Sequence, residues 1–233
     1  MKVSMKDKVR NTPQILLSDV YHPLKYTLIN KFMRQFIVQF YFDGVRQFDF
    51  SVQSDGSFIF KTNSLNHWAA IKDNISAWKR EFCELSDETE HFNFKQPKLT
   101  LTDVIKDRDD IGLNYLDVYQ MLTKYFKVYI KQDGIIYRAE FADGDFVKCS
   151  KEFCESNEKE TCIEFMIDDE VLHKAGKDAS INFSYSDFVD IAQMCAMFFP
   201  CSKITVHTEN SDSKAATFCY DSLAEYVNQK YKY

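Results

Sequence analysis

Asp-Gly pairs beside runs of alternating apolar residues constrain the fold of this chain more than any other feature. An Asp-Gly pair favours a tight turn between antiparallel strands. The pair at 43–44 lies within residues 35–53, and the pair at 133–134 lies within residues 127–144. Each segment is predicted to form two strands joined at its pair. The pair at 55–56 follows the alternating run FDFSVQ and predicts a further turn. The sequence therefore predicts a largely antiparallel sheet.

Apolar residues at helical spacing indicate the helical layer. Leu24, Leu28 and Phe32, for example, recur at the period of one helix face. Either Asp221 or Ser222 is predicted to cap the terminal helix. Helices are predicted over residues 18–38, 64–85, 117–126, 184–200 and 221–232, a surface loop over 86–98, and further strands over 159–168, 203–209 and 215–220.

This order of elements predicts an α+β fold. We expect a two-layer α/β sandwich, in which helices cover one face of a mixed, mostly antiparallel sheet. No internal repeat and no composition shift divides the chain, so residues 1–233 are predicted to form a single domain.

The charge of the chain limits its partners. The net charge of −6 disfavours nucleic acid as the main partner, because neutralising phosphates needs a surplus of Lys and Arg. An acidic surface suits a free cytosolic protein or one with a basic partner. No run of about 18 apolar residues is present, and the first residues lack the features of a signal peptide. We therefore expect a cytoplasmic protein without a membrane partner.

The sequence indicates no metal site. Its seven cysteines form no Cys-x-x-Cys pair, and its five histidines have no metal-ligand spacing. The cysteines are typical of small buried hydrophobes in a reducing cytosol. The acidic runs SDETE and DRDD are more typical of solvated loops than of metal sites. No nucleophile elbow or Walker motif is present.

Several segments follow one another in the order found in a known family. They are KVRNTPQILLSD, HPLKYTLINKFMRQ, VQSDGSFI, VYQMLTKYFKVYIKQDGIIYRAEFADG, ETCIEF, FSYSDFVDIAQMCAMFFPCSKITVHTE and FCYDSLAEYVNQ. Together they resemble the N-terminal ATPase domain of the DNA gyrase B subunit and of topoisomerase IV, which are GHKL or Bergerat-fold ATPases. The resemblance spans nearly the whole chain. It implies the Bergerat fold without the transducer domain that follows in the family.

The resemblance places Thr27 and Lys31 at the catalytic positions of the family. There a Glu on the first helix activates water, and an Asn one turn later holds Mg²⁺. Threonine has no usable basicity at pH 7, and a lysine ammonium repels the metal. Lys31 either touches a phosphate as a point charge or faces solvent or a partner. The resemblance therefore implies no catalytic residue, no bound metal and no ATP hydrolysis.

The adenine-reading motif of the family is also altered. Ser54 falls on the family's Asp, whereas Asp55 and Gly56 keep the turn. Alternatively, a shift of one residue gives Asp55 the adenine role. Ser57 and Phe58 replace the Arg-Gly pair that follows in the family. A Phe58 ring that points inward would fill the adenine cavity, which is what we expect, and one that points outward would be an exposed apolar spot.

The phosphate-binding parts of the family are reduced in this chain. The glycine-rich lid corresponds to DDIGLNYLDVYQML, which contains a single glycine, Gly112. Asp109 and Asp110 place negative charge where phosphates would lie. The Gly-Thr motif keeps Thr161 but has Glu160 in place of glycine. The resemblance thus implies a degenerate pocket and no cofactor; its residues are Ser54, Asp55, Gly56, Ser57, Phe58, Gly112 and Thr161.

An ATPase scaffold without its chemistry is predicted to be a bacterial pseudoenzyme that binds another protein. The first hypothesis is an immunity or inhibitor protein that neutralises a partner such as a basic toxin. The second is a modulator or mimic of type II topoisomerases. The third is a divergent protein that still binds ATP through a rearranged lid.

Overall fold

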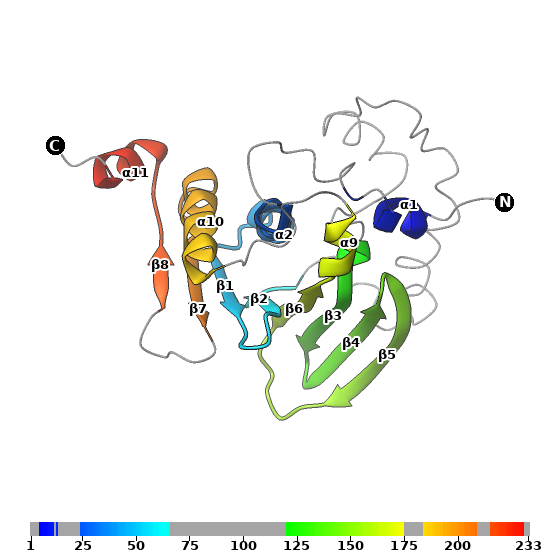
Figure 1. The fold of residues 1–233 in the computed structure, drawn as a ribbon. Coiled ribbons are helices and arrows are strands. Elements are labelled where there is room, and N and C mark those ends of the chain that lie inside the picture. Colours follow the sequence, from blue (N-terminus) through cyan, green and yellow to red (C-terminus); the bar gives the residue numbers. More distant parts are fainter. Residues whose placement is uncertain are drawn as a thin grey trace.

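The computed structural model describes residues 5–11, 13, 24–65, 120–174, 184–208 and 215–230. Their strands form an eight-stranded sheet in the order β5-β4-β3-β6-β2-β1-β7-β8, which runs from right to left in Figure 1. Only the pairing of β1 with β7 is parallel, and every other pair is antiparallel. This mixed, mostly antiparallel sheet with its helices confirms the predicted α+β fold.

The elements have the following bounds in the structure. The strands are β1 Gln47–Val52, β2 Phe58–Thr62, β3 Thr123–Gln132, β4 Ile135–Ala142, β5 Asp145–Phe153, β6 Glu160–Ile167, β7 Lys203–Thr208 and β8 Ala216–Phe218. The helices are α1 Met5–Asn11, α2 Leu24–Tyr41, α9 Asp169–His173, α10 Tyr185–Phe198 and α11 Leu223–Lys230, with a short 3-10 helix, η4, over Gln120–Leu122.

Phenylalanine rings join α2 and α10 to one face of the sheet. Phe32 on α2 stacks on Phe165 of β6, with ring centroids 4.3 Å apart. Phe36, one turn later, meets the edge of Phe60 on β2 at 5.9 Å. Phe188 on α10 lies 6.3 Å from the same Phe60 ring. These rings are fully buried, and aromatic pairs of this geometry add about 0.5–1.5 kcal/mol each beyond their buried area.

The predicted hairpin at Asp43-Gly44 is wrong. Residues 35–41 are the last turns of α2, because Phe36, Ile37 and Phe40 recur at helical spacing and are all buried. Gly44 then ends the helix, with a φ of 88° and its amide bonded to the carbonyl of Tyr41 at 3.1 Å. The same Asp-Gly chemistry therefore caps a helix here.

The prediction of a helix over residues 117–126 is wrong for its second half. Only η4 is helical among the described residues of this segment, and β3 begins at Thr123. The Thr123 hydroxyl donates to the Gln120 carbonyl at 2.6 Å and closes the short turn. Phe126, Val128 and Ile130 of β3 are buried and the residues between them are half-buried, which is the period of a strand.

The other predicted turns and elements named below are present in the described residues. The pair at 133–134 joins β3 to β4, and the pair at 55–56 joins β1 to β2, both as hairpin turns. The predicted elements β6, α10, β7, β8 and α11 are all present. Ser222 caps α11, because its hydroxyl accepts the amide of Glu225 at 3.2 Å. Most of the predicted helix 64–85 and all of the loop 86–98 lie outside the described residues.

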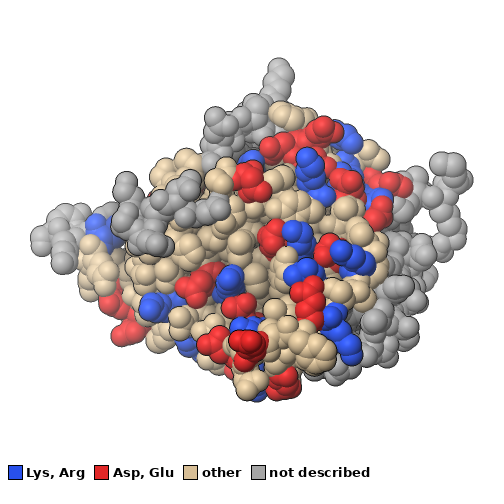
Figure 2. All heavy atoms as spheres, turned by 90° about the horizontal axis from the view of Figure 1, so that it is seen from below, with Lys and Arg blue, Asp and Glu red and all other residues tan. Residues whose placement is uncertain are grey.

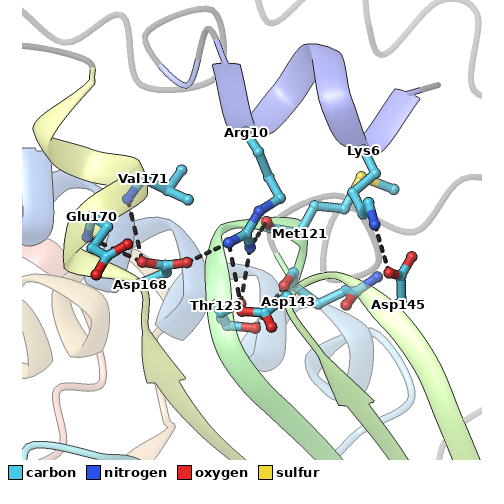
Figure 3. A network of polar contacts seen from close by, with 10 residues as sticks. Lys6, Arg10, Met121, Thr123, Asp143, Asp145, Asp168, Glu170 and Val171 are labelled. Atoms are coloured by element: carbon cyan, nitrogen blue, oxygen red, sulfur yellow. Dashed lines mark hydrogen bonds and ion pairs between the residues drawn. The ribbon is translucent and has the colours of Figure 1, made fainter. Parts of the chain in front are cut away.

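A network of polar contacts attaches α1 to the sheet (Figure 3). Arg10 reaches from α1 to the carboxylate of Asp168 and also donates to the carbonyls of Met121 and Thr123, at 3.1 and 3.3 Å. Asp168 at the same time accepts the amide of Glu170 at 3.0 Å and so caps α9. One half-buried arginine therefore joins three elements at this end of the sheet.

The described part of the chain shows neither a membrane-spanning helix nor a metal-binding cluster. None of its helices is long and apolar enough to cross a membrane. No three or more His, Cys, Asp or Glu side chains in these residues are grouped so that they could hold a metal ion. The cysteines described there are free thiols.

Candidate functional site

Thr27 and Lys31 lie in the first half of α2. Thr27 is 3 % exposed, and its hydroxyl is among the buried polar atoms that have no hydrogen-bond partner in the described structure. Lys31, one turn later, is half-buried. The beginning of the helix is held beside α9 by Lys25, whose ammonium lies 3.1 Å from the Asp169 carboxylate. Neither Thr27 nor Lys31 offers a carboxylate or an amide oxygen.

Thr161 lies at the start of β6 and is fully buried. Its hydroxyl donates to the carbonyl of Ser64 at 2.7 Å. The register of the sheet places it opposite Thr62 of β2, whose own hydroxyl donates to the carbonyl of Gln47 at 2.8 Å. Both threonine hydroxyls at this end of the two strands therefore donate to backbone carbonyls of the chain itself.

Ser54, Asp55 and Gly56 form the exposed turn between β1 and β2. The turn is closed by the Gln53 amide, which donates to the Ser57 carbonyl at 2.8 Å. Asp55 accepts the Ser57 amide at 2.9 Å, and hydrogen bonds from the Ser57 hydroxyl and amide lower the pKa of the Asp55 carboxyl. Gly56 has a φ of 83°, a conformation that glycine adopts without strain. These side chains thus stabilise a hairpin turn.

Phe58 is the first residue of β2, and its ring points toward the helix-covered face of the sheet. It is 1 % exposed. Its ring lies 5.4 Å from the ring of Phe165 and 5.6 Å from that of Phe188. The ring is therefore a core side chain and no exposed apolar spot. That it fills a former adenine cavity stays a prediction.

The structure separates the residues that the resemblance placed in one pocket. Phe58 pairs with Phe165, whereas Thr62 pairs with Thr161 at the other end of the same two strands. Four residues along a strand at about 3.3 Å each correspond to about 13 Å. The turn that precedes Phe58 lies still further from Thr161. The turn at 54–56 and Thr161 therefore lie at opposite ends of the β2–β6 pair, and Gly112 with the lid lies outside the described residues. That these residues form a degenerate pocket stays a prediction.

Sequence reasoning missed Thr62 and Ser64 as the neighbours of Thr161. The aromatic and β-branched run FIFKT follows the turn at Asp55-Gly56 and predicts a strand that ends near Thr62. Counting strand residues from the turn at Asp55 would have placed this strand end beside the start of β6. The match to VQSDGSFI points instead to the opposite end of β2.

The other face of the sheet carries a chain of paired charges. Glu164 on β6 accepts the Lys127 ammonium at 2.7 Å and the Tyr129 hydroxyl at 2.9 Å. Burial, followed by the hydrogen bond to Glu164, raises the pKa of Tyr129. The guanidinium of Arg138 lies 5.0 Å from the centre of the Tyr129 ring and 3.4 Å from the Glu152 carboxylate.

Acidic and basic side chains alternate along this network. Seen from below, the described surface likewise shows the two charges interspersed (Figure 2). The excess of negative charge of the chain is therefore not concentrated in the network around Glu164.

Solved structures with a similar fold are known for this chain. No family model matches the sequence, and no curated protein matches it as a relative. The structure is similar to the 43K ATPase domain of Thermus thermophilus gyrase B, solved in complex with an aminocoumarin, with a TM-score of 0.62, 13 % identity, and coverage of 93 % of this chain and 51 % of that one.

It is also similar to the B subunit of the DNA gyrase from Myxococcus xanthus, with a TM-score of 0.64 and 15 % identity. That match covers 97 % of this chain and 59 % of that one. The chain thus spans between half and three fifths of the length of these gyrase structures. At such low identity the likeness concerns the fold alone. The chain therefore has the fold of the gyrase B ATPase domain.

Proposed function

We propose that this chain is a GHKL-fold protein that does not hydrolyse ATP and that acts by binding and neutralising another protein. The observation that carries the proposal is the pair Thr27 and Lys31 on α2. The resemblance assigns the general base and the metal ligand to these positions. One is a buried hydroxyl without a partner in the described structure, and the other is an ammonium group.

The chemistry of these side chains does not fit a magnesium nucleotide. A general base needs a pKa near the working pH, and an alcohol is far above it. Mg²⁺ takes oxygen ligands, and a lysine cation in its place repels it. The Thr161 hydroxyl is already donated to the Ser64 carbonyl. We therefore derive no hydrolytic step for this chain.

Protein binding is the remaining use of a stable scaffold of this kind. The net charge of −6 favours a basic partner, such as a nuclease-type toxin or another enzyme. The paired charges around Glu164 compensate one another, so we place the partner on another surface of the molecule. An immunity or inhibitor protein in the cytoplasm matches this combination.

The test is a size-exclusion run of the chain with the product of the neighbouring gene. The proposal predicts a stable complex whose affinity falls as salt is raised, because attraction between opposite net charges is screened. Separate elution of the two proteins at low salt would remove the neighbouring product as the partner. A complex whose affinity does not change with salt would contradict the proposal that opposite net charges hold the two proteins together.

The fold likeness to gyrase B favours one alternative, a modulator or mimic of type II topoisomerases. A chain with the shape of a gyrase domain could compete for the partners of that domain. Adding the purified chain to a gyrase supercoiling assay tests this directly. The alternative predicts that supercoiling changes with the dose of the chain, and unchanged supercoiling contradicts it.

A further inference from the structure

The β5 strand forms one edge of the sheet. Among the described residues it pairs with β4 alone. Two large apolar side chains on this strand are exposed, Val147 at 55 % and Phe153 at 93 %. A long edge strand with exposed apolar side chains is a template for pairing with another strand, and natural proteins usually block such edges.

The outer side of β5 carries backbone hydrogen-bonding groups that pair with no other strand of the described part of the chain. The Cys154 amide donates to the Gly134 carbonyl at 2.8 Å, which fixes the phase of the β4–β5 ladder. In an antiparallel ladder alternate residues direct their amide and carbonyl toward the neighbouring strand. The amides and carbonyls of Cys149, Lys151 and Phe153 therefore point away from β4, toward the side on which no described strand lies.

We propose that β5 pairs with β5 of a second copy of this chain, antiparallel and with the two-fold axis at Ser150. In this register Lys148 of each copy lies opposite Glu152 of the other, so two pairs of opposite charge form. Val147 of each copy likewise lies opposite Phe153 of the other. The outward-directed backbones of Cys149 and Lys151 then face each other and exchange hydrogen bonds.

Neighbouring registers are less complementary. With the two-fold axis at Cys149, Val147 would lie opposite Lys151, and Phe153 would lie opposite Asp145. With the axis at Lys151, Lys148 would have no acidic residue opposite it. Opposite charges directly across a strand pair stabilise it by about 0.2–1 kcal/mol each, which favours the axis at Ser150.

The interface is small, so the dimer is expected to be weak. A single strand pair buries less than the roughly 1,200 Å² of a standard stable interface. The register shift of β5 opposite Glu140 and Phe141 limits the regular part of the strand. Self-association is therefore expected at micromolar or higher concentration, and it does not depend on the partner proposed above.

Charge reversal provides the test, by sedimentation velocity over a concentration series. The wild-type chain should shift from monomer to dimer as its concentration rises. Lys148→Glu alone and Glu152→Lys alone should each remain monomeric, because each places like charges opposite each other twice. An equimolar mixture of the two variants should dimerise again, because opposite charges then meet at both positions.

Recovery in the mixture separates the proposal from a folding defect, since two defective chains do not repair each other. Lys61→Glu, an exposed lysine on the inner strand β2, is the matched control and should dimerise like the wild type. A wild-type chain that stays monomeric to the highest soluble concentration would overturn the proposal. Single variants that dimerise as well as the wild type would also overturn it, as would a mixture that stays monomeric.

Discussion

At the residue scale, buried hydroxyls at one end of the sheet stabilise the fold. Thr62 and Thr161 each donate to a backbone carbonyl of the chain, and both are almost completely buried. A buried hydroxyl that already has a partner gains little by bonding a ligand, because it must first give up that bond. Side-chain identity at these positions thus serves the stability of the strand ends.

Cys201 is a residue whose conformation favours glycine. It follows α10 with a φ of 61°, and its amide bonds the Tyr220 carbonyl at 2.7 Å. Cys201→Gly should raise the free energy of unfolding by about 0.5 kcal/mol, because relief of the left-handed strain exceeds the added chain entropy. Urea unfolding measures the difference.

Cys219 provides the control, since it is also exposed but does not have a positive φ. Cys219→Gly should lower the free energy of unfolding by a few tenths of a kcal/mol. If the two substitutions change stability in the same direction, the strain at Cys201 is refuted.

The free energy of unfolding should depend on pH through the carboxyl group of Asp55. Hydrogen bonds from the Ser57 hydroxyl and amide hold its folded-state pKa below the ordinary value of 3.8. The carboxylate therefore contributes stability above pH 3.8, and this contribution is lost as the pH falls through the lower folded-state pKa. Asp55→Asn should be less stable than the wild type by a few tenths of a kcal/mol at pH 7, since the side chain is largely exposed.

The measurement is urea unfolding of the wild type and of Asp55→Asn at neutral and acidic pH. The difference between them should shrink toward zero as the pH falls below 3.8 and through the lower folded-state pKa of Asp55. A difference that stays constant or grows on acidification would show that the charge of Asp55 is not stabilising.

At the element scale, the spacing of apolar residues along the chain decided which helices and strands were predicted correctly. Strand β6 and helix α10 were predictable because their apolar residues recur at periods of two and of three to four. Asp43-Gly44 predicts a hairpin and therefore a strand before it, but Phe36 and Phe40 have helical spacing and belong to the last turns of α2. The Asp-Gly dipeptide signals a turn but not the elements on its two sides.

The sequence pattern gives no clear signal for β5, α1 and α9. The β5 edge strand lacks the alternation of a half-buried strand, because its side chains are exposed on both faces. Helices α1 and α9 are held by the contacts of Arg10 with Asp168, which join residues far apart in the chain. The candidate positions Thr27 and Lys31 on α2 rest on the family resemblance, whereas the pairing of Thr62 with Thr161 is given by the sheet register.

Helix α1 should depend on Asp168. Asp168→Ala removes both the cap of α9 and the carboxylate partner of the half-buried Arg10. The expected loss is about 3 kcal/mol of unfolding free energy, since a lost cap costs about 1 kcal/mol and an unpaired charge costs more. Chemical denaturation gives the value.

Asp168→Asn keeps an oxygen that can cap α9, so its loss of unfolding free energy should be roughly half that of Asp168→Ala. Asp169→Ala, at the exposed neighbouring carboxylate that pairs with Lys25, should lose less than 1 kcal/mol. Equal losses at Asp168 and Asp169 would contradict the role assigned to the Arg10 network.

Strand β2 should depend on Phe58. Its ring is packed between Phe165 and Phe188, so Phe58→Ala should cost about 3–5 kcal/mol of stability. Ile59→Ala, at the half-buried neighbour on the other face, should cost clearly less. Thermal or urea unfolding compares the two. A Phe58→Ala loss below 1 kcal/mol would show that the ring is not part of the core.

At the scale of the whole molecule, the same fold is shared with gyrase B at 13–15 % identity. The fold is what the two share, and in this chain an aromatic core holds the sheet and its helices together. What differs, on the resemblance, is the chemistry at Thr27 and Lys31. A fold can be kept while its site changes, because core packing and site chemistry depend on different side chains.

The central claim is that this scaffold has lost its nucleotide chemistry, and isothermal titration calorimetry with Mg²⁺ and ATP tests it most directly. The account predicts no saturable heat, and no change in melting temperature with ATP in a parallel thermal scan. A ligand at a hundredfold excess over its dissociation constant stabilises a protein by about 2.7 kcal/mol, so binding would be evident. Saturable heat accompanied by a rise in melting temperature would contradict the account and identify the chain as a divergent ATP-binding protein.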